Sequence, residues 1–253
     1  MQPISSSDAN RVVRSIHYSG SVAANSVLHL GVFLNGRCGG VMQFGSPLKK
    51  SFVLPLVRGT KWNDMMELNR MAFAEWLPRN SESRALSVAF KLIKRHYCNV
   101  EWILSFSDAT QCGDGTIYRA SGFVLTQIKR NSGIARFPNG SVIQMMTLHA
   151  NPSRPRPEAN GKTYFEITGG KYNFSRYVRK LGGEILSGFQ LRYVKFLDPS
   201  HIDRLTVPVI PFEKIREIGA TMYRGQRVRS ETSDTLGDQS REGGATPTRT
   251  LHS

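Results

Sequence analysis

Two side chains that can transfer protons stand in short polar segments near the middle of the chain. Tyr118 lies within the run Ile-Tyr-Arg-Ala-Ser-Gly-Phe of residues 117–123, and Asp108 directly follows a strand-like segment. A phenol keeps its proton at neutral pH and can donate it to a leaving group when it is well placed. Asp108 has three interpretations, as a general base, a metal ligand or a turn former, because Asp before a polar, Gly-rich stretch also stabilises turns.

Two other groups offer binding chemistry. His17 and Tyr18 are adjacent, and imidazole and phenol groups are ligands for hard or borderline metals, although an isolated pair also suits a purely structural role. Residues 79–84, Arg-Asn-Ser-Glu-Ser-Arg, stand at a predicted helix start. Free N–H groups at a helix N-terminus attract anions, and two arginines can add charge-assisted bonds to a pyrophosphate. The alternative is an ordinary capped helix with surface arginines.

The elements that must position these groups alternate between strand and helix. A hairpin is predicted through Asn35-Gly36, the strongest short turn signal. Residues 62–73 fit strand or helix, and Ser81 or Ser83 is expected to cap the helix that follows. This order favours an α/β fold with its anion-binding loop at a helix N-terminus, and we expect the three tryptophans in the core. The remaining predicted elements are strands at 28–34, 40–44, 100–106, 123–127 and 189–197 and helices at 83–97 and 116–120.

Composition narrows the class of protein. The 253 residues are 40% hydrophobic, enough for a core, and no apolar run approaches the 18 residues of a membrane span. No secretory signal is visible at the N-terminus, and Cys38, Cys98 and Cys112 lack a metal-binding or disulfide spacing, so a cytoplasmic, reducing compartment is expected.

The net charge of +15 indicates a polyanionic partner, with a merely basic protein as the alternative. Ten Lys or Arg face two acids between Gln127 and Leu181, a net of +8, and aromatic residues are interleaved with them. Such a pattern can hold phosphates and stack on bases. From Met222 onward five Arg nearly balance four acids in a Ser-, Thr- and Gly-rich tail that we expect to be disordered.

Two motifs resemble the GNAT acyltransferases. Residues 79–84 stand where that family places its CoA-binding loop, although the usual glycines are absent. The segment 117–123 resembles the GNAT segment in which a tyrosine on a short helix precedes Gly-Phe and often protonates the leaving CoA thiolate.

Longer blocks are similar to the Mom family of DNA adenine modification proteins of Mu-like phages. They are Glu67–Phe73 with Leu77–Ala85, Asp108–Gly122, and Leu197–Ser200 with Arg204–Phe212, and the likeness covers roughly residues 14–225. The resemblance implies conversion of DNA adenine to a carbamoylmethyl derivative on its exocyclic amine, which protects phage DNA from restriction. It also implies a GNAT-like fold, acetyl-CoA or a related CoA thioester, and an association with iron.

The resemblance assigns site residues, which we treat as expectations. The catalytic candidates are His17, Tyr18, Ser83, Asp108 and Tyr118. The cofactor-binding candidates are Arg70, Arg79, Asn80, Ser81, Glu82, Ser83 and Arg84. With His17, Tyr18 and Asp108 as an N,O,O set, iron would rationalise a product in which nitrogen is bonded to a saturated carbon.

The expected architecture is a GNAT-like α/β core with a central mixed sheet flanked by helices. We expect a catalytic core at 1–126, a basic elaboration at 127–221 that completes the fold and contacts DNA, and the polar tail at 222–253. The expected partner is double-stranded DNA with a flipped adenine, and the oligomeric state, including a homodimer, stays open. The competing functions are a conventional GNAT N-acetyltransferase acting on a protein or small-molecule amine, and an inert acyltransferase core that only binds DNA.

Overall fold

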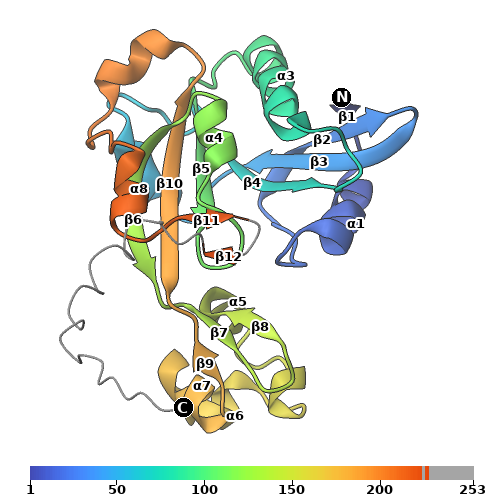
Figure 1. Ribbon diagram of the computed structural model, residues 1–253, viewed down its shortest axis with the longest axis vertical. Helices are drawn as coiled ribbons and strands as arrows, with labels where there is room; N and C mark the ends of the chain where they lie inside the picture. Colours follow the sequence, from blue (N-terminus) through green and yellow to red (C-terminus); the bar gives the residue numbers. More distant parts are fainter. Residues whose placement is uncertain (224–225, 228–253) are drawn as a thin grey trace, which may run out of the picture.

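The protein is built around a seven-stranded mixed sheet, described here from a computed structural model that covers residues 1–223 and 226–227. The strand order is β1-β2-β3-β4-β5-β10-β6, and the β4–β5 pair is parallel whereas the other pairs are antiparallel (Figure 1). This confirms the predicted central mixed sheet flanked by helices. The strands are β1 (Gln2–Pro3), β2 (Ser26–Leu34), β3 (Arg37–Gly45), β4 (Met65–Phe73), β5 (Trp102–Asp108), β6 (Val124–Asn131) and β10 (Gly188–Phe196).

Local sequence signals account for several of these elements. Asn35 and Gly36 both adopt positive φ, at 50° and 76°, which is the backbone that a two-residue hairpin turn between β2 and β3 requires. The ambiguous segment 62–73 forms β4. The expected serine cap of the long helix is wrong, because α3 (Ser81–His96) begins after Asn80 in the left-handed region, at φ 66°, a conformation that Asn tolerates.

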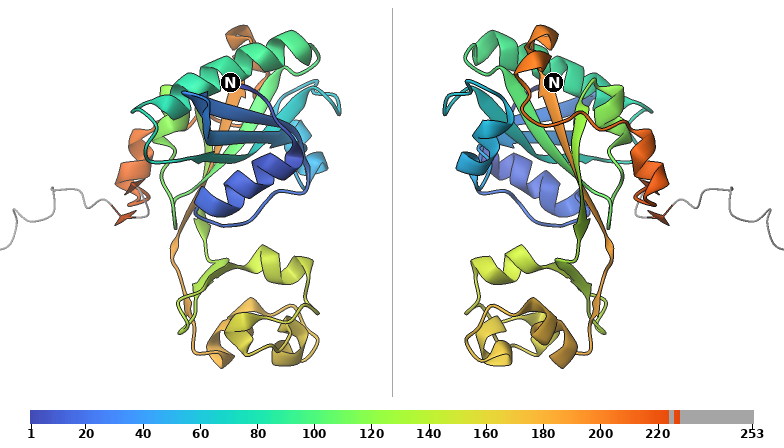
Figure 2. Two further views of the ribbon diagram at one scale, coloured as in Figure 1. Left: turned by 90° about the vertical axis from the view of Figure 1, so that its right-hand side faces the viewer. Right: turned by 90° about the vertical axis from the view of Figure 1, so that its left-hand side faces the viewer.

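Helices cover both faces of the sheet, and Figure 2 shows the strands passing between α3 and α1. On the α3 face, Leu86 and Ile93 of α3 and Tyr118 of α4 (Thr116–Ala120) pack on Met42 and other buried strand residues. On the opposite face, α1 (Ser6–Ile16) packs through Ala9 and Val13, and α2 (Lys50–Val53) with η1 (Leu54–Leu56) covers Met65, Trp102 and Leu104. We call this second side the α1 face.

Two expectations about the core were incomplete. The helix α1 was not predicted, because its sequence is mostly polar. The Ser5 hydroxyl caps its start. Trp102 is fully buried, but Trp62 and Trp76 are 60% and 40% exposed, so placing all three tryptophans in the core was wrong. Lys50 lies over the Trp62 ring and Arg37 over the Trp76 ring, an arrangement that stabilises aromatic side chains at a surface.

The sheet opens in its middle. β4 and β5 pair only at Met65, Met66 and Glu67 opposite residues 102–104, and no backbone pairing continues beyond them within the described residues. The later halves of the two strands are therefore not hydrogen-bonded to each other, and we call this interruption of the pairing the split between β4 and β5. Glu67 is the last paired residue of β4, and Ser105 is the first unpaired residue of β5 on this side.

Residues 132–187 form a small separate body, the inserted subdomain, carried on β6 and β10 (Figures 1 and 2). It has its own three-stranded sheet in the order β8-β7-β9 and its own core, which includes Phe137, Leu148, Tyr164 and Tyr177. Its elements are β7 (Ile134–Arg136), β8 (Val142–Gln144), α5 (Met145–Ala150), η2 (Pro157–Ala159), α6 (Tyr164–Thr168), α7 (Phe174–Lys180) and β9 (Glu184–Ile185). Because β6 and β10 belong to the main sheet, that sheet also draws on residues after the predicted boundary at 126.

The chain after β10 returns to the main body. It forms η3 (Pro199–Arg204), α8 (Glu213–Glu217) and a short hairpin of β11 (Met222–Tyr223) with β12 (Gln226–Arg227). Met222 is buried and its carbonyl accepts a hydrogen bond from the Asp114 N–H, so residue 222 is packed. The rest of the predicted disordered tail, residues 228–253, lies outside the described residues. None of the described helices is both long and apolar enough to cross a bilayer.

Candidate active site

The segment after α1 is held against β4 by one arginine. The Arg70 guanidinium donates hydrogen bonds to the carbonyls of Ser21 (2.8 Å) and Asn69 (2.7 Å). Arg70 pairs with Gln43, whose side chain donates to Asn10 of α1, so both lie on the α1 face. This anchoring holds the loop that carries His17 and Tyr18 against the sheet.

His17 is kept neutral by its surroundings. Its Nδ1 accepts a hydrogen bond from the Ser19 N–H (3.2 Å) and lies 2.8 Å from the Ser19 hydroxyl. Burial and then the positive charge of Arg70 lower the pKa of His17 to about 4. The ring therefore carries no charge at neutral pH, and it lies 4.4 Å, centroid to centroid, from the ring of Tyr18.

Asp108, the last residue of β5, is a turn former and also acts on this cluster. Its carboxylate accepts hydrogen bonds from the Thr110 N–H (2.9 Å) and the Gln111 side chain (3.1 Å). Its negative charge adds to burial in raising the pKa of the Tyr18 phenol and of the Cys112 thiol. Although 47% of Tyr18 is exposed, burial around its phenol group is the main cause of that shift. The turn-former interpretation thus coexists with a place beside Tyr18.

Glu67 belongs to the same cluster and was missed as a site residue. Burial raises the pKa of its carboxyl to about 7, against the opposing effects of a hydrogen bond with Asn69 and the charge of Arg70. Met65 packs on the α1 face, and side chains alternate along a strand, so Glu67 faces the same side. An acid inside the otherwise largely apolar strand Met65–Phe73 was the signal that could have identified it.

Tyr118 stands on the other side of the split. It is 9% exposed on α4, with its ring 5.2 Å from those of both Phe123 and Tyr193. Burial raises the pKa of its phenol to about 12, against the opposing effect of the nearby Ser105 hydroxyl. A phenol with such a pKa stays protonated at neutral pH and can serve as a proton donor but not as a base.

Glu67 and Tyr118 lie on opposite faces of the sheet, near the split, and interact electrostatically. Glu67 on the α1 face and Tyr118 on the α3 face are close enough for their charges to interact, and so are Tyr18 and Tyr118. A group that can accept a proton and a group that can donate one thus lie near the split on opposite faces of the sheet. Such an arrangement suits a reaction in which one reacting group loses a proton on one side and another gains a proton on the other.

The predicted cofactor loop lies apart from this cluster. Residues 79–84 form the first turn of α3 and the segment before it, with Arg79 and Arg84 exposed. The Ser83 hydroxyl donates to the Asn80 carbonyl (3.1 Å), and no hydrogen bond joins it to the other four catalytic candidates within residues 1–223. The structure therefore groups Ser83 with the loop, whereas Arg70 sits with His17, Tyr18 and Glu67.

The expected iron site finds no support in these residues. The part of the chain that the structure describes contains no group of three His, Cys, Asp or Glu side chains placed to hold a metal. The proposed set of His17, Tyr18 and Asp108 would need a phenolate, and the surroundings of Tyr18 raise its pKa. Both Asp108 oxygens are already bonded within their own turn. These residues do not fit the expected metal, and we assign it no step.

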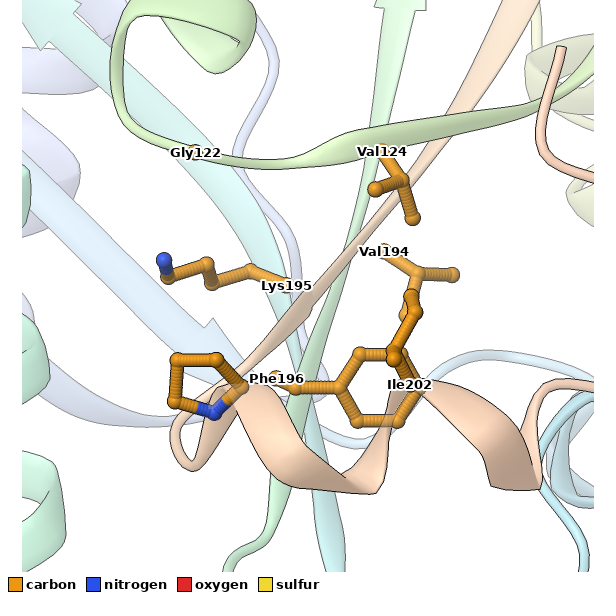
Figure 3. A pocket seen from close by; sticks show the side chains of 7 residues that line it. Gly122, Val124, Val194, Lys195, Phe196 and Ile202 are labelled. Carbon is orange, nitrogen blue, oxygen red and sulfur yellow. The ribbon is translucent and has the colours of Figure 1, made fainter.

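A surface pocket of about 240 Å³ lies elsewhere, at the far end of β10 (Figure 3). Its lining is mainly apolar, with Val194 and Phe196 on its wall and the Lys195 side chain as its one cation. Val194 and Phe196 pair with Leu104 and Trp102, whereas Asp108 pairs with Gln190 at the other end of the strand. The pocket is therefore separate from the candidate active site.

Gly188 fixes the position of the Asp108 turn. A methyl group at Gly188 would lie 2.2 Å from the Thr110 Oγ1 and 2.7 Å from its Cα, so Gly188→Ala must displace either the turn or β10. Because misplacement of a catalytic group by about 1 Å can cost about 100-fold in rate, we expect Gly188→Ala to lower the transfer activity at least about tenfold while the protein still folds. Gly113→Ala is the control, since its nearest neighbour would be 3.7 Å away. Equal activity of both variants, measured as product per enzyme, would contradict this role.

Comparison with known proteins confirms the resemblance found in the sequence. A curated relative, the methylcarbamoylase Mom of Escherichia phage Mu, is 44% identical over 116 residues, which are 46% of this chain and 48% of the phage protein. The match thus spans about half the length of that relative. Among solved structures, the ribosomal-protein-S18-alanine N-acetyltransferase from Escherichia coli is similar with a TM-score of 0.40 and 10% identity, covering 78% of this chain and 92% of that enzyme. An aminoglycoside 6′-N-acetyltransferase from Enterococcus faecium follows with a TM-score of 0.32 and 9% identity, covering 68% and 73%.

The family assignment rests on the match that covers most of the chain. A model of the Mom protein family matches residues 1–214, which include the main sheet, the inserted subdomain and every predicted site residue. The chain therefore belongs to the Mom protein family.

Proposed function

We propose that this protein is a DNA-modifying transferase that converts adenine to its carbamoylmethyl derivative on the exocyclic amine, and so protects phage DNA from restriction in the host cytoplasm. Family membership and the similarity to a methylcarbamoylase support this proposal. The observation that carries it is the split between β4 and β5, with Glu67 on one face and Tyr118 on the other. This geometry suits transfer to an amine.

The α3 side suits the donor. The N–H groups at the start of α3, with the exposed Arg79 and Arg84, fit the pyrophosphate of a CoA thioester, although Glu82 in the same turn offsets part of the charge. When bound, such a thioester would supply an activated carbonyl group. Tyr118 would then protonate the leaving thiolate. Because the product joins nitrogen to a saturated carbon, acyl transfer alone does not complete the reaction, and the residues described here account only for its proton transfers.

The α1 side suits the acceptor. The exocyclic amine of adenine is a poor nucleophile because its lone pair is delocalised into the ring. Loss of a proton as the new bond forms would help it react, and we assign Glu67 as the carboxylate that receives that proton. Neutral His17 and the phenol of Tyr18 lie on the same side and can position the base through hydrogen bonds.

The inserted subdomain carries exposed cations that can contact the phosphates of the DNA backbone. A target adenine is stacked in the duplex, so the enzyme must extrude it at a cost of a few kcal/mol that phosphate contacts help to offset. No salt bridge joins the exposed cations of the subdomain to any other described residue. These free cations are Arg136, Arg154, Lys162, Lys171, Arg176, Arg179 and Lys180.

The proposal is tested on the DNA of cells that express the protein. We expect nucleoside digests of that DNA to contain an adenosine heavier by one carbamoylmethyl group, and an Asp108→Ala variant to reduce it strongly. If the DNA stays unmodified while proteins or small-molecule amines become acetylated, the conventional N-acetyltransferase is the correct function. DNA binding with neither product would identify an inert core.

We expect charge reversal on α7 to weaken DNA binding. Arg176→Glu with Lys180→Glu removes two contacts one helical turn apart, so the slope of log affinity against log salt should fall by about 2, at about 0.9 per phosphate contact. The matched control reverses Lys91 and Arg95, which are also exposed and four residues apart, on α3. Fluorescence anisotropy on a duplex over a salt series measures both. Identical slopes for the two variants would show that α7 does not contact DNA.

A further inference from the structure

Residues 46–62, between β3 and β4, expose an unusual set of apolar side chains. Leu48 is 80% exposed, Phe52 77% and Trp62 60%, and these are among the most exposed large apolar side chains of the described chain. Single exposed apolar residues are common on soluble proteins, but three within 15 positions indicate a contact surface. We call residues 46–62 the aromatic strip.

All charged residues of the aromatic strip are basic. It contains Lys49, Lys50, Arg58 and Lys61 and no Asp or Glu. The Lys49 ammonium lies 6.0 Å from the centre of the Phe52 ring, and the Lys50 ammonium lies 4.7 Å from that of Trp62. None of the four cations forms a salt bridge with a described residue. Lys50 is buried, whereas Lys49, Arg58 and Lys61 are exposed and remain available to phosphates.

The strip adjoins the acceptor side of the candidate active site. Gly45, which directly precedes it, pairs with Glu67 in the sheet. Its inner residues Leu56 and Val57 pack on the α1 face together with Trp102.

We propose that the aromatic strip is a second DNA-contacting surface, which binds unstacked bases beside the target adenine. This inference rests on the proposed function. Phe52 and Trp62 stack on bases, whose flat faces any aromatic ring can cover regardless of sequence, and Lys49, Arg58 and Lys61 hold the neighbouring phosphates. Extrusion of one adenine leaves the neighbouring bases partly unstacked. The aromatic rings of the strip then cover base faces that would otherwise be exposed to water. An anionic membrane is disfavoured, because the four-residue α2 is much shorter than a membrane-binding amphipathic helix.

The test compares two duplexes that differ in a single unpaired adenine. For Phe52→Ala with Trp62→Ala in the full-length protein, we expect affinity for the duplex with the unpaired adenine to fall by about tenfold or more. Affinity for the fully paired duplex should change less than about threefold. Trp76→Ala is the matched control, since it removes another exposed tryptophan that lies under an arginine but is outside the strip. Circular dichroism checks that each variant folds, and Lys49→Glu with Lys61→Glu replaces the aromatic pair if it does not.

The outcomes separate this inference from the proposed function. Loss of the preference for unpaired adenine supports the strip even if no modified adenosine is found, in which case the function alone fails. If the strip variants bind both duplexes as the wild type does, and the protein modifies adenine, the proposed role of the strip is wrong and the proposed function stands. Lost binding to phosphatidylglycerol vesicles with unchanged DNA binding would also overturn it, in favour of a membrane.

Discussion

Tyr118→Phe is expected to lower the yield of modified adenosine by about 100-fold to 10,000-fold, the usual contribution of a general acid. The substitution removes one oxygen from a buried side chain and leaves the ring contacts with Phe123 and Tyr193 in place. Because burial raises the pKa of the Tyr118 phenol to about 12, the wild-type group is protonated at every pH at which the protein is handled. The loss should therefore be nearly independent of pH between about 6 and 9.

The control for this experiment is the neighbouring tyrosine. The Tyr193 hydroxyl donates its proton to the Asp114 carbonyl, so it is already engaged in a structural hydrogen bond. Tyr193→Phe should cost about 1 kcal/mol of unfolding free energy through that lost hydrogen bond and should keep most of the activity. Nucleoside mass spectrometry and thermal unfolding measure the two effects. Full activity of Tyr118→Phe, or equal losses of activity in both variants, would show that Tyr118 is not the proton donor.

Glu67→Gln is expected to abolish most of the activity and at the same time to stabilise the protein above pH 7. The folded protein raises the pKa of this carboxyl from 4.5 to about 7, so folding favours its protonated form. The stability that protonation provides is complete below about pH 4.5 and is lost as the pH rises through 7. Glutamine is neutral at all pH values and avoids that loss. At about 1.4 kcal/mol per pH unit, the gain at pH 8 is at most about 3.5 kcal/mol.

The pH dependence makes the prediction specific. At pH 4 the wild type and Glu67→Gln should unfold at similar denaturant concentrations, and the variant should become the more stable of the two as the pH rises to 8. Wild-type activity should rise with pH around an inflection near 7, because the base acts as the carboxylate. Glu75→Gln, at an exposed position, should change neither property. A variant that is destabilised at pH 8, or that retains activity, would show that Glu67 is a structural residue.

Local sequence determined the elements whose stabilising interactions lie within a few residues. Asn35-Gly36 specifies the hairpin turn because these residue types tolerate positive φ. The short helix at Thr116–Ala120 was predicted with the bounds that the structure has. Among the residues that the family resemblance named, electrostatic contacts link His17, Tyr18, Arg70, Asp108 and Tyr118 in the fold. Their roles in the reaction remain predictions.

Only the tertiary structure decided which side of the sheet each group serves and how it titrates. The sequence did not single out Glu67 as a site residue, because its raised pKa comes from burial by elements distant in sequence. The aromatic strip was not distinguished, because composition does not show whether a tryptophan packs inside, as Trp102 does, or outside, as Trp62 does. The split between β4 and β5 depends on where strand pairing stops, which residue types in either strand do not specify. Local conformational preferences act over a few residues, whereas burial, charge coupling and strand register arise only when distant segments come together.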